Sequence, residues 1–316
     1  MFEFLKNHTY PIGVDIEDDA IKLVQLGTNG NGVVLIAAGS EKCPEDIPPG
    51  SAVWQRWAIE MLRRQTMNGK FAGKYVTAAI PAGEVFIEHI KMPKVKDSND
   101  SQMEEAVISK IKQRLPFEVE KSIIKYIAAE DDNMVVIATE RKKIDRYLAI
   151  YEKANLQIQS MSVWPTVLIN IYVKFFGRRK SDLDAVVMLL DTEPACTNVV
   201  ICRHRSLLFA RSIPLGTSQL ATGTNEVIMR LVLELTACKR QLSSMYKNAQ
   251  IERTIFISGQ ALDKDICMTI AKQLELPAHI GDCLAAVEIS DLQKIAGINR
   301  RDCRFSWATA FGLSLL

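Results

Sequence analysis

Two short polar turns contain side chains that could bind phosphate or a divalent cation. The first, DIEDDAIK (residues 15–22), begins with Asp15 at the end of an apolar run and closes with Lys22 as the next run starts. Carboxylates are preferred ligands of Mg²⁺, and a lysine ammonium is a point charge for phosphate oxygens. Three further carboxylates stand between these ends: Glu17, Asp18 and Asp19. The turn could be a solvated hairpin, a metal site, or a phosphate loop that has lost the chemistry to hold phosphate.

A second turn of similar composition follows 176 residues after the first. DTEPACTN (residues 191–198) also begins with an aspartate at the end of an apolar run, Asp191, and it closes with Thr197 and Asn198. The terminal aspartate, the polar turn and the flanking strand pattern recur together, which indicates an internal repeat. We therefore expect two similar halves that face one another across a cleft.

The histidines and cysteines show no spacing typical of a metal or disulfide site. The 4 histidines are scattered, and no CxxC pair occurs. Dispersed thiols, odd in number, fit a reducing cytosol better than a disulfide framework. The cysteines are Cys43, Cys196, Cys202, Cys238, Cys267, Cys283 and Cys303.

The composition is that of an internal globular protein large enough for two domains. The chain has 316 residues, 48% of them hydrophobic, and its 39 basic against 37 acidic residues leave no basic half that would suggest nucleic-acid binding. The longest apolar stretch, residues 166–176, is interrupted by Asn170 and Lys174 and is too short to span a bilayer. The start, MFEFLKNHTY, lacks the apolar core of a signal peptide.

The elements that must position the two turns are short strands. Strands are predicted over residues 12–16, 21–26 and 33–38, and GTNGNG joins the last two as a hairpin. A helix with Trp54 on its apolar face follows. A matching set of three strands begins at Ala185. Each turn is thus expected to connect the first two strands of a β-meander.

Residues 84–155 form a segment of different character between the halves. Ser101 and Glu104 have capping-box spacing, which predicts a helix that Pro116 stops. Two strands and a helix over residues 142–154 follow. We predict a small α+β subdomain inserted into the first half. The apolar face of its first helix would consist of Met103, Val107, Ile111 and Leu115.

The ordered set of segments resembles the actin-like ATPase superfamily and, within it, the PilM family of type IV pilus assembly proteins. The family's first phosphate loop, I-G-[IVL]-D-[IL]-G-x-x-x-[IV]-K, is similar to IGVDIEDDAIK, and its second, D-x-G-x-x-x-T-N, is similar to DTEPACTN. Four further segments resemble family signatures in the expected order: RLPFEVE (114–120), LLFARSIPLG (207–216), TIFISGQAL (254–262) and FSWATAFGLSLL (305–316).

The resemblance implies a bilobed actin-like α/β fold built from duplicated ribonuclease H-like domains. The inserted α+β subdomain would correspond to a known insertion in the first lobe. The expected division is residues 1–83, completed by about 156–180, for the first lobe, 84–155 for the insertion, 184–224 and 284–316 for the second lobe, and 225–283 for a subdomain of that lobe.

The same resemblance implies ATP and magnesium as cofactors, with Asp15 and Asp191 as metal ligands. Lys22, Thr197 and Asn198 match other phosphate-loop positions. On the adenosine side, Hsp70-type members contact base and ribose through a helix that matches residues 225–246. The residues carried over to the adenosine side are Lys239, Arg240, Ser243, Gly259 and Gln260. For the three helix residues among them, a solvated basic face is the alternative.

Both phosphate loops depart from the family pattern. Glu17 and Glu193 replace the glycines that let the backbone approach phosphate, and Pro194 removes a backbone donor. A carboxylate about 4 Å from a phosphate oxygen repels it by roughly 1–4 kcal/mol, depending on the effective dielectric. We therefore expect a degenerate nucleotide site, and we identify no group that would orient a hydrolytic water.

The resemblance implies a cytoplasmic scaffold rather than an enzyme. Members of the PilM family bind the cytoplasmic amino-terminal tail of PilN, an inner-membrane protein, in a groove beside the inserted subdomain, and so join the inner-membrane platform of the pilus machine. The machine could assemble pili, take up DNA or secrete proteins. Three alternatives stay open: an active ATPase, a small-molecule kinase of the superfamily, and a free-standing relative of the GspL platform of type II secretion.

Overall fold

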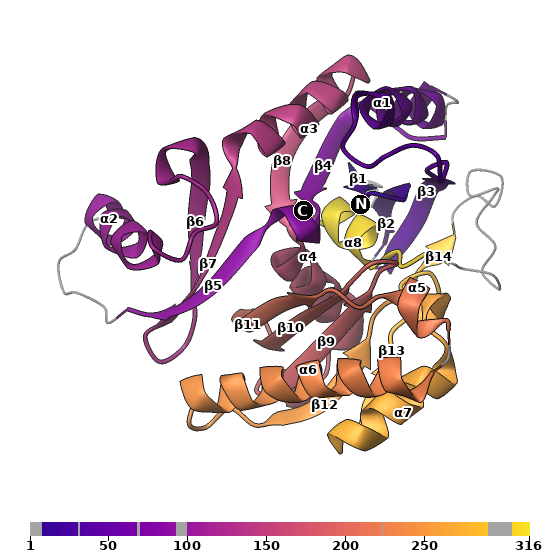
Figure 1. Ribbon diagram of the computed structural model, residues 1–316. Coiled ribbons are helices and arrows are strands. Elements are labelled where there is room, and N and C mark those ends of the chain that lie inside the picture. Colours follow the sequence, from indigo (N-terminus) through magenta and orange to yellow (C-terminus); the bar gives the residue numbers. More distant parts are fainter. Residues whose placement is uncertain (1–7, 31, 68–69, 93–99, 223, 290–304) are drawn as a thin grey trace, which may run out of the picture.

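The computed structural model describes residues 8–30, 32–67, 70–92, 100–222, 224–289 and 305–316 (Figure 1). The amino-terminal stretch before residue 8, most of the polar loop KVKDSND and Cys303 lie outside the described residues.

The first sheet contains both the first predicted turn and its flanking strands. Its central strands are buried on both faces, which explains their nearly continuous apolar sequence. The described strands follow the order β14 (Glu288–Ile289), β3 (Gly32–Lys42), β2 (Ala20–Asn29), β1 (Thr9–Ile16), β4 (Tyr75–Ile80) and β8 (Gln157–Val163).

The second sheet repeats this arrangement. Strands β9 and β10 pair as β1 and β2 do. The strand that follows the three-stranded meander, β12, pairs parallel with β9, as β4 does with β1. The internal repeat predicted from the sequence is therefore confirmed. The order is β11 (Ser206–Ile213), β10 (Thr197–Arg203), β9 (Val186–Thr192), β12 (Ile251–Phe256) and β13 (Ala278–Ile280).

A third, smaller sheet belongs to the inserted segment. Helix α2 (Asp100–Ile111) packs on it through Val107 and Ile111, and Met103 and Leu115 are partly buried beside them. The helix was expected to continue to Pro116 but ends at Ile111, because the chain turns over the residues preceding the proline. The sheet order is β5 (Phe86–Lys91), β7 (Asn133–Glu140) and β6 (Ser122–Ala128).

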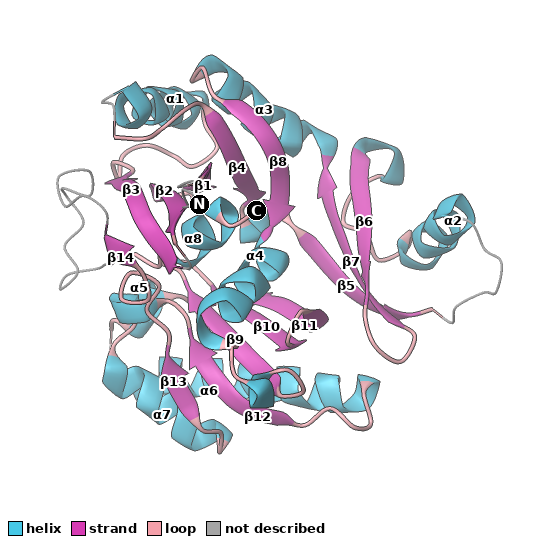
Figure 2. Cartoon of the chain, turned by 180° about the vertical axis from the view of Figure 1, so that it is seen from behind, coloured by secondary structure: helices cyan, strands magenta, loops and turns pink. Residues whose placement is uncertain are grey.

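Helices cover the outer faces of the two large sheets and fill the space between them (Figures 1 and 2). Helices α1 (Ala52–Met67) and α3 (Arg141–Lys153) cover the first sheet. Helices α6 (Asn225–Met245) and α7 (Lys264–Leu274) cover the second, and the short α5 (Thr217–Leu220) precedes α6. Among the described residues, no helix is long and apolar enough to cross a membrane.

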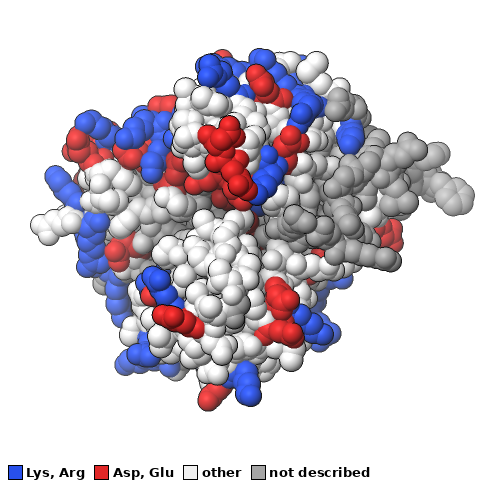
Figure 3. All heavy atoms as spheres, turned by 45° about the vertical axis from the view of Figure 1, so that its right-hand side comes forward, with Lys and Arg blue, Asp and Glu red and all other residues white. Residues whose placement is uncertain are grey.

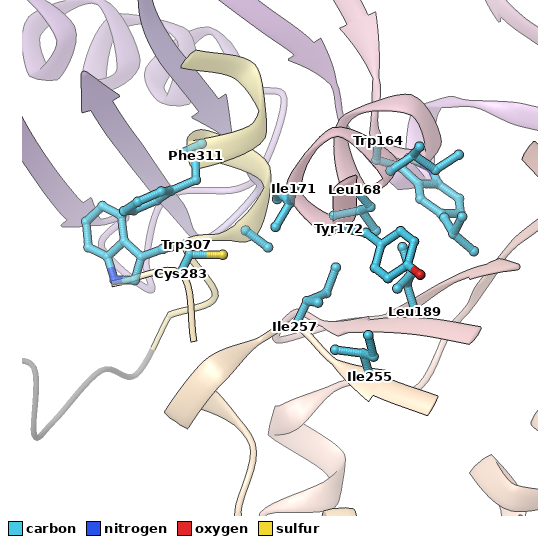
Figure 4. Close-up of a cluster of buried hydrophobic side chains, with 14 of the residues drawn as sticks. Trp164, Leu168, Ile171, Tyr172, Leu189, Ile255, Ile257, Cys283, Trp307 and Phe311 are labelled. Carbon is cyan, nitrogen blue, oxygen red and sulfur yellow. The ribbon is translucent and has the colours of Figure 1, made fainter. Parts of the chain in front are cut away.

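Two buried helices, α4 (Trp164–Ile171) and α8 (Ala308–Ser314), form the layer between the sheets. Figure 4 shows Phe311 of α8 and Trp307, the residue directly before α8, on one side of the cluster. Tyr172, the residue directly after α4, lies on the other side. The cluster also contains Leu189 of β9 and reaches strands of both sheets. One continuous apolar core thus joins the halves, while our division of the chain into lobes and subdomains stays a prediction.

Candidate functional site: two facing hairpins

The two predicted turns have the same backbone construction. Asp15 lies opposite Lys22 in the β1–β2 ladder, and Asp191 lies opposite Asn198 in the β9–β10 ladder. The pair Asp15–Lys22 in the first hairpin therefore corresponds to the pair Asp191–Asn198 in the second, at the same offset of 176 residues that relates the two sequences. The residues at the ends of each turn lie in paired strands, which limits where their side chains can point.

The two glutamates that replace family glycines occupy equivalent places in these turns. The Glu17 N–H donates to the carbonyl of Ala20 at 2.8 Å, and the Glu193 N–H donates to the carbonyl of Cys196, also at 2.8 Å. The two turns are therefore closed by the same backbone hydrogen bond, and each carries a glutamate side chain at the equivalent place.

Lys22 joins the two hairpins. Its Nζ lies 2.8 Å from Oδ2 of Asp15 within its own hairpin. The same Nζ lies 3.1 and 3.2 Å from the two carboxylate oxygens of Glu193 on the other hairpin. All three side chains are at most 3% exposed, so this is a buried ion triad. The sequence identified each of these residues but gave no signal that Glu193 meets Lys22.

Carboxylates outnumber cations in this cluster, and the pKa values of its carboxyl groups and of Lys22 are shifted. Burial, together with Asp15 and Glu193, raises the pKa of the half-buried Glu17 well above its usual range. Burial also raises the pKa of Glu193, although Lys22 opposes this, and it raises the pKa of Asp191. For Lys22 burial would lower the pKa, but the surrounding carboxylates outweigh burial and raise it well above its usual value. The surroundings therefore favour the ammonium form of Lys22 and disfavour simultaneous ionisation of all the carboxyls around it.

Asp191 is held by the carboxy-terminal segment. The hydroxyl of Ser306 donates to Oδ1 of Asp191 at 2.5 Å, and both residues are buried. Beside it, the backbone N–H of Thr192 donates to the hydroxyl of Ser258 at 2.6 Å. Neither serine could be identified as a site residue from the sequence, because a single serine carries no positional signal.

The other predicted residues of the second loop are buried and engaged in the fold. The Thr197 hydroxyl donates to the carbonyl of Leu215 at 2.7 Å. Asn198 is 2% exposed and lies in the β10 strand. Their binding role stays a prediction, since the hydroxyl of Thr197 already has a structural partner.

The structure separates the predicted adenosine residues into two places. Lys239 and Ser243 line a hollow near the end of α6, and Nζ of Lys239 donates to the carbonyl of Leu274 at 2.7 Å. Gly259 and Gln260 line a different hollow with Asp282. Arg240 is exposed. The two hollows share no lining residue, and the adenosine role of all five predicted residues stays untested.

A family model described as type IV pilus assembly protein PilM matches residues 13–238, most of the chain. The chain belongs to the PilM family. No curated protein sequence matches it significantly. The match spans both hairpins, so the charged cluster described above lies within the PilM-family region.

Solved structures place this PilM-family chain in the actin-like fold. The PilM–PilN type IV pilus biogenesis complex has a chain that matches with a TM-score of 0.76 at 19% identity, over 97% of this chain and 98% of that one. A Bacteroides thetaiotaomicron protein of actin-like ATPase fold has a TM-score of 0.53 at 14% identity, over 93% and 98%. The ethanolamine utilization protein EutJ of Carboxydothermus hydrogenoformans has a TM-score of 0.51 at 12% identity, over 97% and 89%. The predicted fold class is confirmed.

The ATP and magnesium that the resemblance implies can be tested against these hairpins. Lys22, the lysine of the PilM phosphate-loop pattern, is already neutralised by two carboxylates, those of Asp15 and Glu193. A phosphate chain does not fit this arrangement. Carboxylate oxygens of Asp15, Glu17 and Glu193 lie within 4.8 Å of one another, whereas Asp191, the second predicted metal ligand, is not in this group. In Figure 3 acidic side chains gather above the central hollow, with Lys and Arg side chains beside them.

Proposed function

We propose that this PilM-family protein is an ATP-independent scaffold on the cytoplasmic side of a type IV pilus or related machine. In this role it holds the amino-terminal tail of a PilN-like inner-membrane protein and links it to the other platform components. Two findings support the proposal: the fold agrees with that of PilM from a PilM–PilN complex over nearly its whole length, and Lys22, the lysine of the predicted phosphate loop, is paired with carboxylates of both hairpins.

The observation that carries the binding proposal is a hollow of about 850 Å³ beside the inserted sheet. One wall is the RLPFEVE segment between α2 and β6, and the other is the start of α3 with the end of β7. Pro116 is exposed, and Leu115 and Phe117 are half-buried. The lining is completed by charged residues of both signs: Glu118, Glu120, Lys121, Glu140, Arg141, Lys142 and Asp145.

This hollow suits an extended peptide that carries an apolar anchor. Its lining combines three apolar residues, Leu115, Pro116 and Phe117, with charged residues of both signs, a composition that suits a peptide groove. Strand β6 is an edge strand of its sheet, because only β7 pairs with it among the described strands. An extended tail can therefore add backbone hydrogen bonds at this edge while an apolar side chain occupies the space beside Pro116.

Peptide titration tests the proposal. A labelled peptide with the tail sequence of the PilN-like protein from the same genome should bind the wild type, and Pro116→Asp should weaken binding at least about tenfold, because it places a charge at the apolar centre. Pro277→Asp is the matched control, an exposed proline at the start of β13 on the second sheet. Adding ATP should not change the affinity. No binding by the wild type, or equal effects of the two substitutions, would refute the proposal.

A further inference from the structure

Glu193 reaches across the space between the hairpins to a lysine 171 residues away. Its carboxylate meets Nζ of Lys22 with both oxygens, at 3.1 and 3.2 Å, where neither side chain is exposed by more than 3%. A buried ammonium without an anion is strongly disfavoured, so Lys22 requires such a partner. Asp15 supplies one from the same hairpin, and Glu193 supplies the only contact of this triad that links different sheets.

The backbone of Glu193 is fixed in this position. Its N–H donates to Cys196, and its carbonyl accepts from the N–H of Thr217 at 2.9 Å. Gly216 lies so close that a Cβ on it would come within 2.3 Å of the carbonyl oxygen of Glu193. The carboxylate is therefore presented by a packed turn. The position of the Glu193 carboxylate is thus set by the packing of its backbone and not by the free rotation of a surface side chain.

We propose that Glu193 is an internal anionic ligand of Lys22, which takes the position of a bound phosphate and holds the two hairpins together without nucleotide. Shortening this side chain would uncover a latent site for a small oxyanion, formed by Lys22 and the vacated space. The inference deepens the ATP-independent scaffold proposed above and rests on it for its biological meaning, but the ion-pair chemistry can be tested separately.

The test is anion rescue of Glu193→Gly in the full chain, followed by thermal unfolding with inorganic phosphate as the probe. Without phosphate, the substitution should lower the melting temperature by roughly 5–10 °C, since it leaves a buried ammonium short of one anion. Phosphate should restore most of this loss, while chloride at equal ionic strength should not. The wild type should show no phosphate-dependent shift, because its site is filled.

Two further variants control the result. Glu193→Gln keeps the volume but not the charge, so it should be destabilised without rescue. Lys22→Met combined with Glu193→Gly removes the cation and should lose the phosphate response. If Glu193→Gly does not fold, Glu193→Asp, which keeps a shortened carboxylate, should show a smaller loss and weaker rescue.

Three results would overturn the inference: Glu193→Gly as stable as the wild type, no rescue by phosphate, or equal stabilisation of the wild type by phosphate. The tail titration distinguishes this failure from failure of the proposed function. If the wild type binds no tail but rescue occurs, the internal ligand stands and the scaffold role does not. If the tail binds but rescue is absent, the reverse holds.

Discussion

Substituting Gly13 with alanine should be unusually destabilising, although the change adds only a methyl group. A Cβ at Gly13 would lie 2.1 Å from the carbonyl oxygen of Ala310 and 2.5 Å from the backbone nitrogen of Ser314, both in α8. Helix α8 cannot retreat, because a Cβ on Gly312, within the same helix, would lie 2.5 Å from the carbonyl oxygen of Val167 in α4. Backbone is thus in close contact on both sides of the helix.

The expected magnitude follows from this confinement. Overpacking a core costs about 1–3 kcal/mol when side chains can adjust, and here the blocking atoms are backbone, so we expect about 3 kcal/mol or more. At roughly 2–4 °C per kcal/mol, the melting temperature should fall by about 6–12 °C. Urea unfolding followed by circular dichroism would measure the loss of free energy of unfolding.

Gly83→Ala is the matched control, because a Cβ there would meet nothing within 4 Å. Its free energy of unfolding should change by no more than about 0.5 kcal/mol. If Gly13→Ala is also within about 0.5 kcal/mol of the wild type, close packing of α8 is not what fixes the first hairpin. The consequence extends to the site, since the Ser314 hydroxyl in α8 donates to the carbonyl of Pro11 and accepts from the N–H of Leu26, which flank that hairpin.

Two other predictions concern charge. Replacing Glu17 and Glu193 together by glycine should strengthen ATP binding at least about tenfold in calorimetry, because two repelling carboxylates are removed; unchanged affinity would show that the acidic turns are not what blocks the site. His89 is stacked on Phe209 at 4.4 Å, accepts the N–H of Ala210, and has its pKa lowered by burial to about 4. Its contribution to stability is therefore present above pH 6.5 and is lost as the pH falls towards 4, so the wild type should lose about 2 kcal/mol more than His89→Phe between pH 7 and pH 5 in urea unfolding.

Local patterns were sufficient to predict the three-stranded meander and the polar turn of each half. The apolar runs that include or precede Asp15 and Asp191 form β1 and β9. The residues of the β1–β2 ladder pair in the same register as the residues 176 positions later in the β9–β10 ladder. These features depend on neighbours in the chain, which periodicity and turn residues report directly. The glycine of the IGVD segment was part of the matched pattern, but the sequence did not show that α8 requires it.

Contacts between distant segments could not be predicted in the same way. In the sequence, Glu193 is recognisable only as the replacement of a family glycine, whereas in the structure its carboxylate pairs with Lys22. Ser306 could not be distinguished from other serines until the fold placed it against Asp191. The pairing of such residues depends on how the two sheets pack together, and a short stretch of sequence carries no information about that packing.

The repeat provides a matched pair of glutamates with different surroundings. Glu193 faces Lys22, but the residue equivalent to Lys22 in the second hairpin is Asn198, so the first hairpin's Glu17 has no corresponding ammonium there. One substitution of glycine by glutamate is thus compensated by an ion pair, and the other is not.

We therefore expect opposite outcomes for two chemically identical changes. Glu193→Gln should destabilise the protein by about 1–3 kcal/mol, because Lys22 loses one of its two carboxylate partners and keeps Asp15. Glu17→Gln should be neutral or stabilising. Because the pKa of Glu17 is raised in the folded protein, its stabilising effect is present at low pH and is lost as the pH rises through that pKa. The gain from Glu17→Gln should accordingly be larger at pH 8 than at pH 5 in urea unfolding. Equal effects of the two substitutions would mean that Lys22 does not discriminate between the two turns.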